Sequence, residues 1–497
     1  MTSPSPNPRR RTVAIVLAAG LGTRMKSRLP KVLHPLCGRP MLGYVIDAAR
    51  EATGERPVVV YSPSTAAIRD VFDGEAEFVL QDPPQGTGDA VRVAMAALPA
   101  DAAEVLVVSG DVPRVSADVL RELLDQRRLD EAAFALTSVI AFDPRQLGRV
   151  VRGDAGAVEK IVEVKDATEE ELEIGEINAG LYAFDGEWLR SRIGRLTPSQ
   201  RTKELYLTEL VTIARADGRI VAALEVEDDG RLLGINDRAE LAQAEWDLRT
   251  EINDRHMRNG VTMRDPSTVY LDSTVELAED VTLEPNVILR GRTRVGRGSV
   301  IGAGSQLVDA TIGEGCTVLA SIIDSSELRD GVQVGPWSRV RNGAVLDDEV
   351  RIGNFAEIKN SRLGRGVKQN HFSYLGDADV GEGTNVGAGS ITANWDGVTK
   401  HPTKIGKRVF LGVDTMLRAP VTVGDGAKTG AGAVVTKDVP PGKLAVGVPA
   451  RIRELKATET DGAAGPDRAA DGAATESAAE GAATTNPTDA GRRRAKR

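Results

Sequence analysis

The sequence predicts a doubly wound α/β domain followed by a parallel β-helix of hexapeptide repeats. Short aliphatic runs alternate with amphipathic segments in the first half of the chain, as in sheets covered by helices on both faces. From about residue 269 to residue 449, aliphatic or small residues recur at every sixth position, and glycine follows many of them. After Lys456 the chain contains only small, charged and polar residues and proline, so we expect no core there.

The α/β prediction depends on the order of the apolar segments. We expect strands at residues 13–17, 58–61, 78–80 and 105–108, and helices at residues 41–50 and 89–98. This alternation predicts a mostly parallel sheet, in which ligands bind beyond the carboxyl ends of the strands. The residues that follow each strand are therefore the first candidates for chemistry.

The β-helix prediction depends on the period of the apolar residues. A helix needs a period near 3.6 and an open sheet a period of 2, so a six-residue period fits neither. It fits short flat faces joined by corners, with each aliphatic side chain pointing inward and glycine permitting the tight bend. An antiparallel sandwich is the alternative, but few hairpin signals separate the repeats. The first repeats carry Val269, Val275, Val281, Val287 and Thr293, and the later doublets are Val295-Gly296, Ile312-Gly313, Val334-Gly335, Ile352-Gly353, Val380-Gly381, Ile405-Gly406 and Val423-Gly424.

The segment between the two domains is expected to be helical. Leu241, Leu248 and Ile252 fall on one helical stripe, and Asn259-Gly260 is typical of a helix C-cap. The expected boundaries are 1–11 for a disordered N-terminal tail, 12–235 for the α/β domain, 236–262 for the helical linker, 263–455 for the β-helix and 456–497 for a disordered tail.

Composition and charge exclude several classes of protein. With 497 residues, a net charge of -9 and a pI near 5.3, the chain has no general nucleic-acid surface. Its two cysteines lie in different expected domains, which favours a reducing, cytoplasmic setting over a disulfide framework. Four histidines are too few for a histidine-rich metal site, and no apolar run of about 18 residues predicts membrane insertion.

A glycine-rich loop follows the first expected strand. Gly20 and Gly22 allow backbone amides to turn toward an anion, and Arg24 and Lys31 bring two cations to the same loop. This arrangement suits a triphosphate, although two glycines alone are also compatible with an ordinary strand-to-helix turn. The Gly-x-x-x-x-Gly-Lys pattern of P-loop proteins is absent from the sequence.

The longer motif resembles a known family. Leu-x-x-Gly-x-Gly-Thr-Arg-Met from Leu17, followed by Pro30-Lys31, resembles the sugar-1-phosphate nucleotidyltransferases. Joined to hexapeptide repeats, it is similar to the bacterial family of bifunctional N-acetylglucosamine-1-phosphate uridylyltransferases and glucosamine-1-phosphate N-acetyltransferases, over about residues 13–449. The resemblance implies a nucleotidyltransferase domain, a left-handed β-helix, a homotrimer, and Mg²⁺, UTP, acetyl-CoA and the two sugar phosphates as ligands.

The resemblance also implies roles for residues of the first domain. Arg24 and Lys31 would stabilise the departing pyrophosphate, because the sugar phosphate is already a nucleophile and needs alignment and charge neutralisation more than a base. Asp111 and Asn236 would hold Mg²⁺, although a strand-end aspartate can also cap a helix or be an ordinary turn residue. The substrate-binding residues implied are Leu17, Ala18, Ala19 and Gly20 in the loop, Gln81, Gly86 and Thr87 for uracil, and Gly148, Glu163, Asn178 and Asn236 for the amino sugar.

A second cluster of polar residues interrupts the repeats. An ammonium group must lose a proton before it attacks a thioester, and histidine suits that step; the resemblance implies that His371 is the proton acceptor. By resemblance, Arg341, Lys359, Tyr374 and Asn385 would bind the sugar phosphate, and Asn394 would orient the amine and the thioester. Acetyl-CoA would lie along Ala388, Asn394, Trp395, Val413, Ala431 and Arg451.

The sequence departs from the family pattern beside both clusters. In the first domain, Asp89 stands where many relatives have histidine, Ala179 where many have threonine and Glu209 where aspartate is usual. In the repeats, Val413 replaces a serine, Asn342 a proline and Trp395 a tyrosine, and Arg451 could substitute for an arginine expected near Val448. Two alternatives stay open: a single-activity nucleotidyltransferase with a non-catalytic oligomerising β-helix, and a catalytically inactive scaffold.

Overall fold

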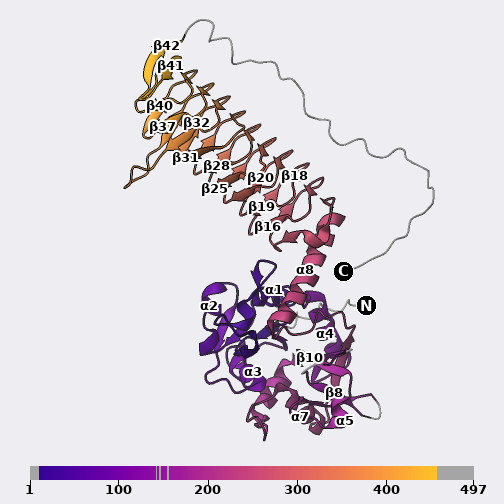
Figure 1. The fold of residues 1–497 in the computed structure, drawn as a ribbon. Coiled ribbons are helices and arrows are strands. Elements are labelled where there is room, and N and C mark those ends of the chain that lie inside the picture. The colour runs from indigo at the N-terminus through magenta and orange to yellow at the C-terminus, as the bar shows by residue number, and fades with distance from the viewer. Residues whose placement is uncertain (1–10, 142, 145–146, 154–155, 456–497) are drawn as a thin grey trace, which may run out of the picture.

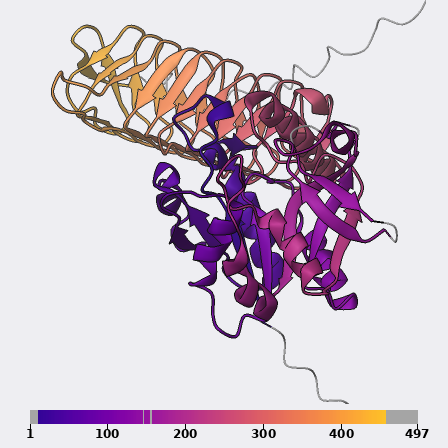
Figure 2. The same ribbon diagram turned by 90° about the horizontal axis from the view of Figure 1, so that it is seen from below.

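The computed structural model describes residues 11–141, 143–144, 147–153 and 156–455. An α/β domain lies at one end of a long column of stacked coils, and helix α8 (Arg238–Arg258) joins the two (Figures 1 and 2). The tails expected at residues 1–11 and 456–497 lie outside the described residues except for Arg11, which forms ion pairs with Glu55 and Asp101. In the described part of the chain, no helix combines the length and the apolar character that crossing a membrane requires.

The α/β domain is built on one mixed sheet. Its strand order is β11-β7-β10-β6-β1-β4-β5, with β8 and β9 attached beside β10. Strand β10 runs antiparallel to β6 and β7, whereas β1 is parallel to both β4 and β6. The strands are β1 (Thr12–Leu17), β4 (Val58–Tyr61), β5 (Glu77–Leu80), β6 (Glu104–Ser109), β7 (Phe134–Ile140), β8 (Arg149–Arg152), β9 (Val158–Val162), β10 (Glu176–Asp185) and β11 (Val221–Val226).

Alternating residues of the central strands feed two cores. Ala14 and Val16 pack with α1 and α4 on one face, whereas Val13 and Ile15 pack with α3, α6 and α7 on the other. Both faces are therefore covered, which confirms the doubly wound class. The helices are α1 (Met41–Thr53), α2 (Ile68–Val71), α3 (Thr87–Met95), α4 (Ala117–Leu129), α5 (Glu169–Leu172), α6 (Gly186–Arg192) and α7 (Leu210–Ala216), with 3-10 turns η1 (Thr23–Met25), η2 (Lys31–Leu33), η3 (Pro63–Thr65), η4 (Ile193–Arg195) and η5 (Leu207–Glu209).

The column consists of three sheets of short parallel strands that face one another, as the repeat predicts, and it is a left-handed parallel β-helix. One sheet contains β12 (Thr262–Met263), β15 (Thr282–Leu283), β18 (Val300–Ile301), β21 (Thr317–Val318), β24 (Gln333–Val334), β27 (Arg351–Ile352), β30 (Lys368–Gln369), β33 (Asn385–Val386), β36 (Phe410–Leu411), β39 (Lys428–Thr429), β41 (Lys443–Val446) and the antiparallel β42 (Arg451–Glu454).

The second and third sheets complete each coil. The second contains β13 (Tyr270–Leu271), β16 (Ile288–Arg290), β19 (Gln306–Val308), β22 (Ile322–Asp324), β25 (Arg339–Arg341), β28 (Ala356–Lys359), β31 (Ser373–Gly376), β34 (Ile391–Ala393), β37 (Met416–Arg418) and β40 (Val434–Val435). The third contains β14 (Glu276–Leu277), β17 (Arg294–Val295), β20 (Thr311–Ile312), β23 (Glu327–Leu328), β26 (Val345–Leu346), β29 (Arg362–Leu363), β32 (Ala378–Val380), β35 (Thr403–Ile405) and β38 (Val421–Val423).

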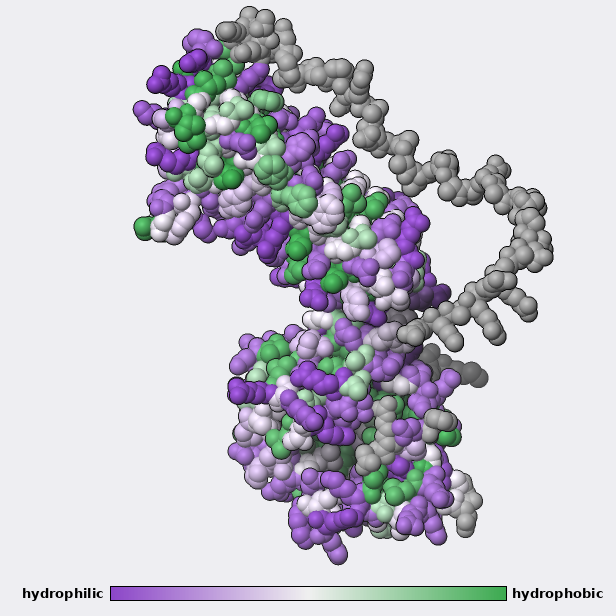
Figure 3. Space-filling model, in the orientation of Figure 1, coloured by the Kyte–Doolittle hydropathy of each residue, from purple (hydrophilic) through white to green (hydrophobic). Residues whose placement is uncertain are grey.

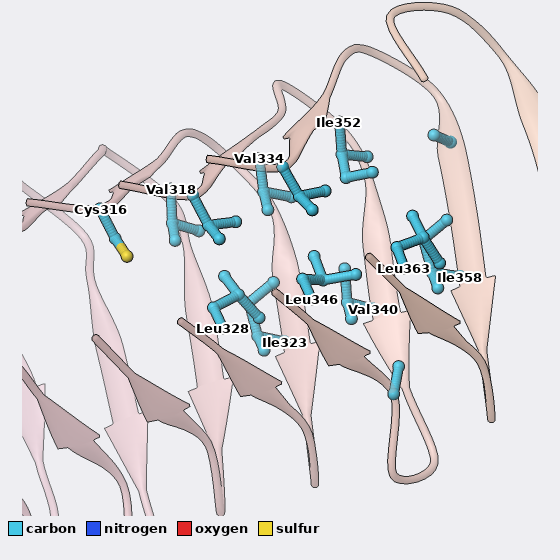
Figure 4. Close-up of a cluster of buried hydrophobic side chains, with 14 of the residues drawn as sticks. Cys316, Val318, Ile323, Leu328, Val334, Val340, Leu346, Ile352, Ile358 and Leu363 are labelled. Atoms are coloured by element: carbon cyan, nitrogen blue, oxygen red, sulfur yellow. The ribbon is translucent and has the colours of Figure 1, made fainter. Parts of the chain in front are cut away.

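The inward residues form one continuous core. Figure 4 shows aliphatic side chains from all three sheets meeting inside the coil, among them Ile323, Leu346 and Ile358, each fully buried. The doublet residues expected to point inward are buried as well, from Val295 at 3% exposed to Val423 at 0%. Burial of this repeated stripe provides the main stabilisation of the column.

Gly335 has φ +109° and permits a bend, as expected, but other glycines of the doublets serve a different purpose. A Cβ on Gly296 would lie 2.6 Å from the backbone of Gly313, and one on Gly353 would lie 1.9 Å from the Asn370 carbonyl oxygen. Neither glycine has a positive φ, so the close approach of the next coil, and not a bend, excludes a side chain at these two positions. Several corners with positive φ are instead occupied by other residue types, such as Asn286 and Asp414.

The hairpin of β2 (Pro35–Leu36) and β3 (Arg39–Pro40) connects the domain to the column. The Cys37 amide donates to Glu245 of α8 at 2.7 Å, and the Cys37 carbonyl oxygen accepts the amide of Ser273 at 2.9 Å. Tyr44 adds a hydroxyl contact to Ser273 at 3.0 Å. Helix α8 begins after Asp237, whose side chain accepts the amides of Ala239 and Glu240.

Candidate active sites

The carboxyl ends of two adjacent strands bring the first site together. Strands β1 and β6 pair in parallel, with Leu17 opposite Ser109, so the loop after Leu17 and the loop that carries Asp111 leave the sheet side by side. Gly22 has φ +59°, and a Cβ there would lie 2.5 Å from the Lys31 side chain. Glycine is therefore required for Lys31 to reach the site.

Four predicted residues converge at this edge of the sheet. The Lys31 ammonium donates to the Asp111 carboxylate and, at 3.1 Å, to the side-chain oxygen of Asn236. Arg24 donates to the same Asn236 oxygen at 2.7 Å. The backbone amide of Asn236 donates to the Glu240 carboxylate at 2.7 Å, which anchors Asn236 to the start of α8. The structure thus places Lys31 against both predicted metal ligands and Arg24 against Asn236.

The Asp111 carboxylate and the Asn236 side-chain oxygen are suitable ligands for Mg²⁺. A carboxylate oxygen and an amide oxygen are donors that Mg²⁺ accepts, and it commonly completes its coordination with substrate phosphates and water. The Lys31 ammonium contacts both atoms, so this position already favours a positive charge. No group of three or more histidine, cysteine, aspartate or glutamate residues suited to a metal occurs in the described residues. An ion here would therefore depend on the substrate for its remaining ligands.

Two cavities meet at Asp111. A cavity of about 530 Å³ contains most of the residues implied for the sugar, and one of about 410 Å³ contains most of those implied for the nucleotide. Leu17, Thr87, Ser109 and Asp111 line both, so the predicted metal ligand lies on their common border. The larger cavity is also lined by Arg24, Gly148, Glu163, Asn178 and Asn236, and the smaller by Ala19, Gly20, Gln81 and Gly86. Ala18 is buried and lies outside both linings.

Two polar side chains are held in place in the larger cavity. Asn178 donates its amide to the Tyr182 hydroxyl at 2.6 Å, and its side-chain oxygen accepts the Gly180 amide at 3.2 Å. The Thr208 hydroxyl donates to Glu163 at 3.3 Å. Burial raises the pKa of Glu163 above its ordinary value, with smaller contributions from the nearby carboxylates Asp166 and Glu204.

The sequence analysis missed Tyr182 and Thr208. Tyr182 is four residues after Asn178 on the same strand, β10, but a bulge lies between them, so no regular alternation could have identified it. Thr208 belongs to η5, which reaches the site only through folding: the Leu207 amide donates to the Thr87 hydroxyl at 3.0 Å. No local signal marks that contact.

The smaller cavity is bounded by a constrained loop. Gly86 has φ +107°, and a Cβ there would lie 2.6 Å from the Leu205 carbonyl oxygen. The adjacent Gln81 side chain is 2% exposed and donates to the Gly86 carbonyl oxygen at 3.0 Å. The expected helix at residues 89–98 begins earlier, at Thr87, because the chain turns into α3 directly after Gly86.

The second cluster lies on consecutive coils of the column. Arg341 pairs with Lys359 across β25 and β28, and Lys359 pairs with Gly376 across β28 and β31. A Cβ on Gly376 would lie 2.2 Å from the Tyr374 hydroxyl, so the tyrosine ring folds over this glycine toward Lys359. Arg341 also donates to Glu357 at 2.7 Å. Asn385 lies on β33, in the neighbouring sheet.

Asp377 links this cluster to the loop at residues 394–401. It accepts the side-chain amides of Asn360 and Asn394. Despite its partial burial, these amides and the nearby charges of Lys359 and Lys400 hold the pKa of Asp377 below its ordinary value. Lys359 is close enough to lower the pKa of Lys400. Two ammonium groups therefore lie side by side where the sequence predicts a phosphate, and the sequence analysis had singled out neither Lys400 nor Asp377.

His371 lies at the corner between β30 and β31 and is exposed. Its carbonyl oxygen accepts the Ser373 hydroxyl at 3.0 Å. In the part of the chain that the structure describes, no side chain forms a hydrogen bond or ion pair with its imidazole. The ring is therefore accessible to a substrate or to a second copy of the chain.

The residues implied for acetyl-CoA follow one edge of the column. The Asp414 amide donates to the Ala388 carbonyl oxygen at 2.7 Å, and the Gly432 amide donates to that of Val413 at 2.8 Å, which places Ala388, Val413 and Ala431 on successive corners. Val413 is 49% exposed and Trp395 is 55% exposed. Apolar residues gather on the surface at this far end of the column (Figure 3). Arg451 is exposed and begins β42, the last strand.

Comparison with known proteins follows the same division of the chain. Residues 14–153 match a MobA-like NTP transferase domain, residues 266–364 a GMPPB C-terminal domain, and residues 402–437 the bacterial transferase hexapeptide repeats. Each match falls within one of the two parts of the fold.

Relatives match across both parts. A protein of Kineococcus radiotolerans named bifunctional protein GlmU is 46% identical over 442 residues, covering 87% of this chain and 89% of the relative. Proteins of the same name from Mycobacterium bovis and Listeria monocytogenes are each 42% identical, covering 88% and 87% of this chain and 90% and 95% of their own lengths. This identity over nearly the whole length confirms the family that the motifs predicted, and the chain belongs to the GlmU family of bifunctional transferases.

Proposed function

We propose that this chain makes UDP-N-acetylglucosamine in two reactions at two separate sites. The column transfers an acetyl group from acetyl-CoA to glucosamine-1-phosphate. The α/β domain then joins the product, N-acetylglucosamine-1-phosphate, to the uridylyl group of UTP and releases pyrophosphate. We assign residues 12–235 to the uridylyltransferase domain, 236–262 to the linker and 263–455 to the acetyltransferase domain.

The contact of Lys31 and Arg24 with Asp111 and Asn236, at the border of the two cavities, carries the uridylyl assignment. The phosphate oxygen of the sugar attacks the α-phosphate of UTP, and the bond to pyrophosphate breaks. Arg24 and Lys31 neutralise the negative charge that develops on the departing pyrophosphate. Bound by Asp111 and Asn236, Mg²⁺ would supply further charge neutralisation at the phosphates.

Sugar recognition follows from the groups in the larger cavity. Asn178 is fixed by Tyr182 and Gly180, so its amide is aligned before the sugar arrives. Glu163 can accept a hydrogen bond from a sugar hydroxyl, and Thr208 orients its carboxyl group. In the smaller cavity, Gln81 contacts the uracil ring.

Acetyl transfer uses the polar cluster on the coils. Arg341, Lys359 and Tyr374 bind the phosphate of glucosamine-1-phosphate, and Asn385 contributes from the neighbouring sheet. His371 takes a proton from the sugar ammonium, and the free amine attacks the thioester carbonyl carbon. The carbon–sulfur bond breaks, and coenzyme A leaves as the thiol after taking up a proton. Asn394 orients the amine, and Ala388, Trp395, Val413, Ala431 and Arg451 line the path of acetyl-CoA.

We further propose a homotrimer in the cytoplasm. Trp337 and Phe355 stack on the surface of the column with ring centroids 5.3 Å apart, and both are about 60% exposed, which supports burial against another copy. The exposed His371 is consistent with a site completed between copies. Cys37 and Cys316 are both unpaired and buried, as expected in a reducing compartment.

One coupled assay tests the proposal. The chain is incubated with glucosamine-1-phosphate, acetyl-CoA, UTP and Mg²⁺, and free thiol, pyrophosphate and UDP-N-acetylglucosamine are measured. Formation of all three supports two activities. Pyrophosphate only from preformed N-acetylglucosamine-1-phosphate indicates a nucleotidyltransferase with a non-catalytic β-helix, and no product indicates a scaffold. Sedimentation of the same preparation tests the trimer, and a monomer at assay concentration would contradict it.

A further inference from the structure

The side-chain amide of Gln81 has both of its hydrogens engaged inside the protein. Its nitrogen Nε2 donates to the Gly86 carbonyl oxygen at 3.0 Å and to Asp89 Oδ2 at 2.8 Å. An amide nitrogen carries two hydrogens, so none remains for a ligand. Gln81 lines the smaller cavity, and its oxygen Oε1 is the atom left to contact what binds there.

This orientation is determined by the chemistry of the neighbours. A carbonyl oxygen and a carboxylate oxygen can only accept, so the reversed amide would place Oε1 against two acceptors. Asp89 is 3% exposed in the first turn of α3, and Arg92, one turn later, donates to its other oxygen, Oδ1. Both carboxylate oxygens are therefore occupied as acceptors, and Asp89 is fixed as the partner of Gln81.

We propose that Asp89 is a positioning residue that sets nucleobase selectivity through Gln81. Since Gln81 presents only an acceptor, the cavity selects a base with an N–H donor at N3, as in uracil. Cytosine has an acceptor at N3 and would face a second acceptor. This inference rests on the proposed function, because it takes the smaller cavity to hold the base of UTP.

Asp89→Asn is the informative variant because it keeps the size of the side chain and adds a donor. The Arg92 guanidinium claims the one remaining oxygen of the new amide, so the NH₂ group faces Gln81. Gln81 then turns its Oε1 toward residue 89, gives up its hydrogen bond to the Gly86 carbonyl oxygen and presents Nε2 to the cavity, which suits cytosine. In the double variant Asp89→Asn/Arg92→Leu, no guanidinium competes for the asparagine oxygen. That oxygen can then accept a hydrogen bond from Gln81 Nε2, as the Asp89 carboxylate does in the wild type.

The test compares UTP with CTP for each protein. Dissociation constants come from calorimetry, and kcat/KM comes from pyrophosphate release with N-acetylglucosamine-1-phosphate and Mg²⁺. We expect the preference of the wild type for UTP to fall at least about tenfold in Asp89→Asn and to return in the double variant. Glu77→Gln, which removes an exposed carboxylate from β5 outside the cavity, should leave the preference unchanged.

The outcomes separate this inference from the proposed function. Selective UTP binding that weakens in Asp89→Asn and returns in the double variant, without pyrophosphate release by the wild type, would overturn the function and support the inference. If Asp89→Asn weakens the binding of UTP and CTP equally and leaves the UTP preference unchanged, Asp89 has a purely structural role and the inference is overturned. A wild type that binds neither nucleotide, or a folded double variant that regains no selectivity, would overturn it as well.

Discussion

Asn394 donates its side-chain amide to Asp377, which also accepts the amide of Asn360 at 2.5 Å. Because a carboxylate only accepts, the Asn394 oxygen must point away from Asp377, and we propose that it contacts the sugar amine. Asp377 has φ +51°, uncommon for a residue with a side chain, and the surrounding coils hold it there.

Asp377→Asn should therefore lower kcat for acetyl transfer at least about tenfold, because Asn394 loses its fixed orientation. Thiol release measures this effect, and uridylyl transfer by the same preparation should be unchanged. Asn360→Ala is the matched control, since it removes the other amide and leaves the contact between Asn394 and Asp377. Equal losses in the two variants would show that Asp377 acts only on the local fold.

Asp111→Asn should reduce uridylyl transfer at least about a hundredfold and leave acetyl transfer intact. The substitution removes the carboxylate from the proposed Mg²⁺ site and from its contact with Lys31. Pyrophosphate release across a Mg²⁺ titration measures the first activity, and thiol release the second. Loss of both activities in a folded variant would contradict the separation of the two sites.

Glu163 should make stability depend on pH. Burial raises its pKa above the ordinary 4.5, so in the window between 4.5 and the raised value the folded state binds more protons than the unfolded state. This contribution to stability is fully present below pH 4.5 and is lost as pH rises through the raised pKa. Glu163→Gln removes it, so the Tm of the variant should rise relative to the wild type across that window.

Thermal denaturation between pH 4 and 8 measures the difference in Tm. Subtracting the two curves cancels the other carboxyl groups, which both proteins share. A difference that stays flat with pH would show that Glu163 is as easily ionised in the folded chain as in the unfolded one.

Val413→Ser should lower the KM for acetyl-CoA severalfold with kcat unchanged. Val413 is 49% exposed on the edge proposed for acetyl-CoA, and a hydroxyl there offers one hydrogen bond that valine cannot make, about 1 kcal/mol. Steady-state kinetics at saturating glucosamine-1-phosphate test this. A variant whose kcat rises while KM stays fixed would place residue 413 nearer the reacting thioester than we propose.

Leu346→Ala should destabilise the β-helix by about 3 kcal/mol, because a fully buried aliphatic side chain in the shared core leaves a cavity. Urea unfolding of the full chain, followed by far-UV circular dichroism, measures the shift of the β-helix transition. Arg351→Ala, exposed on the neighbouring strand, should change that transition by less than about 0.5 kcal/mol. Equal shifts of the urea transition in the two variants would mean that the interior residues contribute little to the stability of the β-helix.

The six-residue period predicted the column well because each inward residue is selected by the same physical requirement on every coil. The role of the glycines was only partly predicted. Gly296 and Gly353 accommodate the next coil, which is a contact between residues distant in sequence, and no local pattern distinguishes it from a bend. The short strands also left the corners undetermined, since residues such as Asn286 adopt the left-handed conformation there.

The site residues divide in the same way. Asp111 does not cap α4, because Ser116 does, but it lies in a turn after β6, so the alternative of an ordinary turn residue stays open. Lys31, Asp111 and Asn236 were identified by motif, and folding brings them into contact. The sequence could not identify Asp377, Lys400 and Thr208 as site residues. Each reaches its site through strand register or through a loop contact between residues distant in sequence, and no local pattern marks such contacts. The roles assigned to all of these residues stay predictions until the assays above are done.

Three residues proposed to bind the phosphate of glucosamine-1-phosphate lie on three successive coils: Arg341 on β25, Lys359 on β28 and Tyr374 on β31. Coils stack at about 4.8 Å, so the coils between α8 and β25 act as a spacer of fixed length between the two catalytic centres. Removing one whole coil from that spacer would shorten the separation by one increment and leave both chemistries intact. Removing a coil between β25 and β31 would instead disrupt the proposed phosphate site. The number of coils can therefore change without loss of activity between α8 and Arg341, but not between Arg341 and β31.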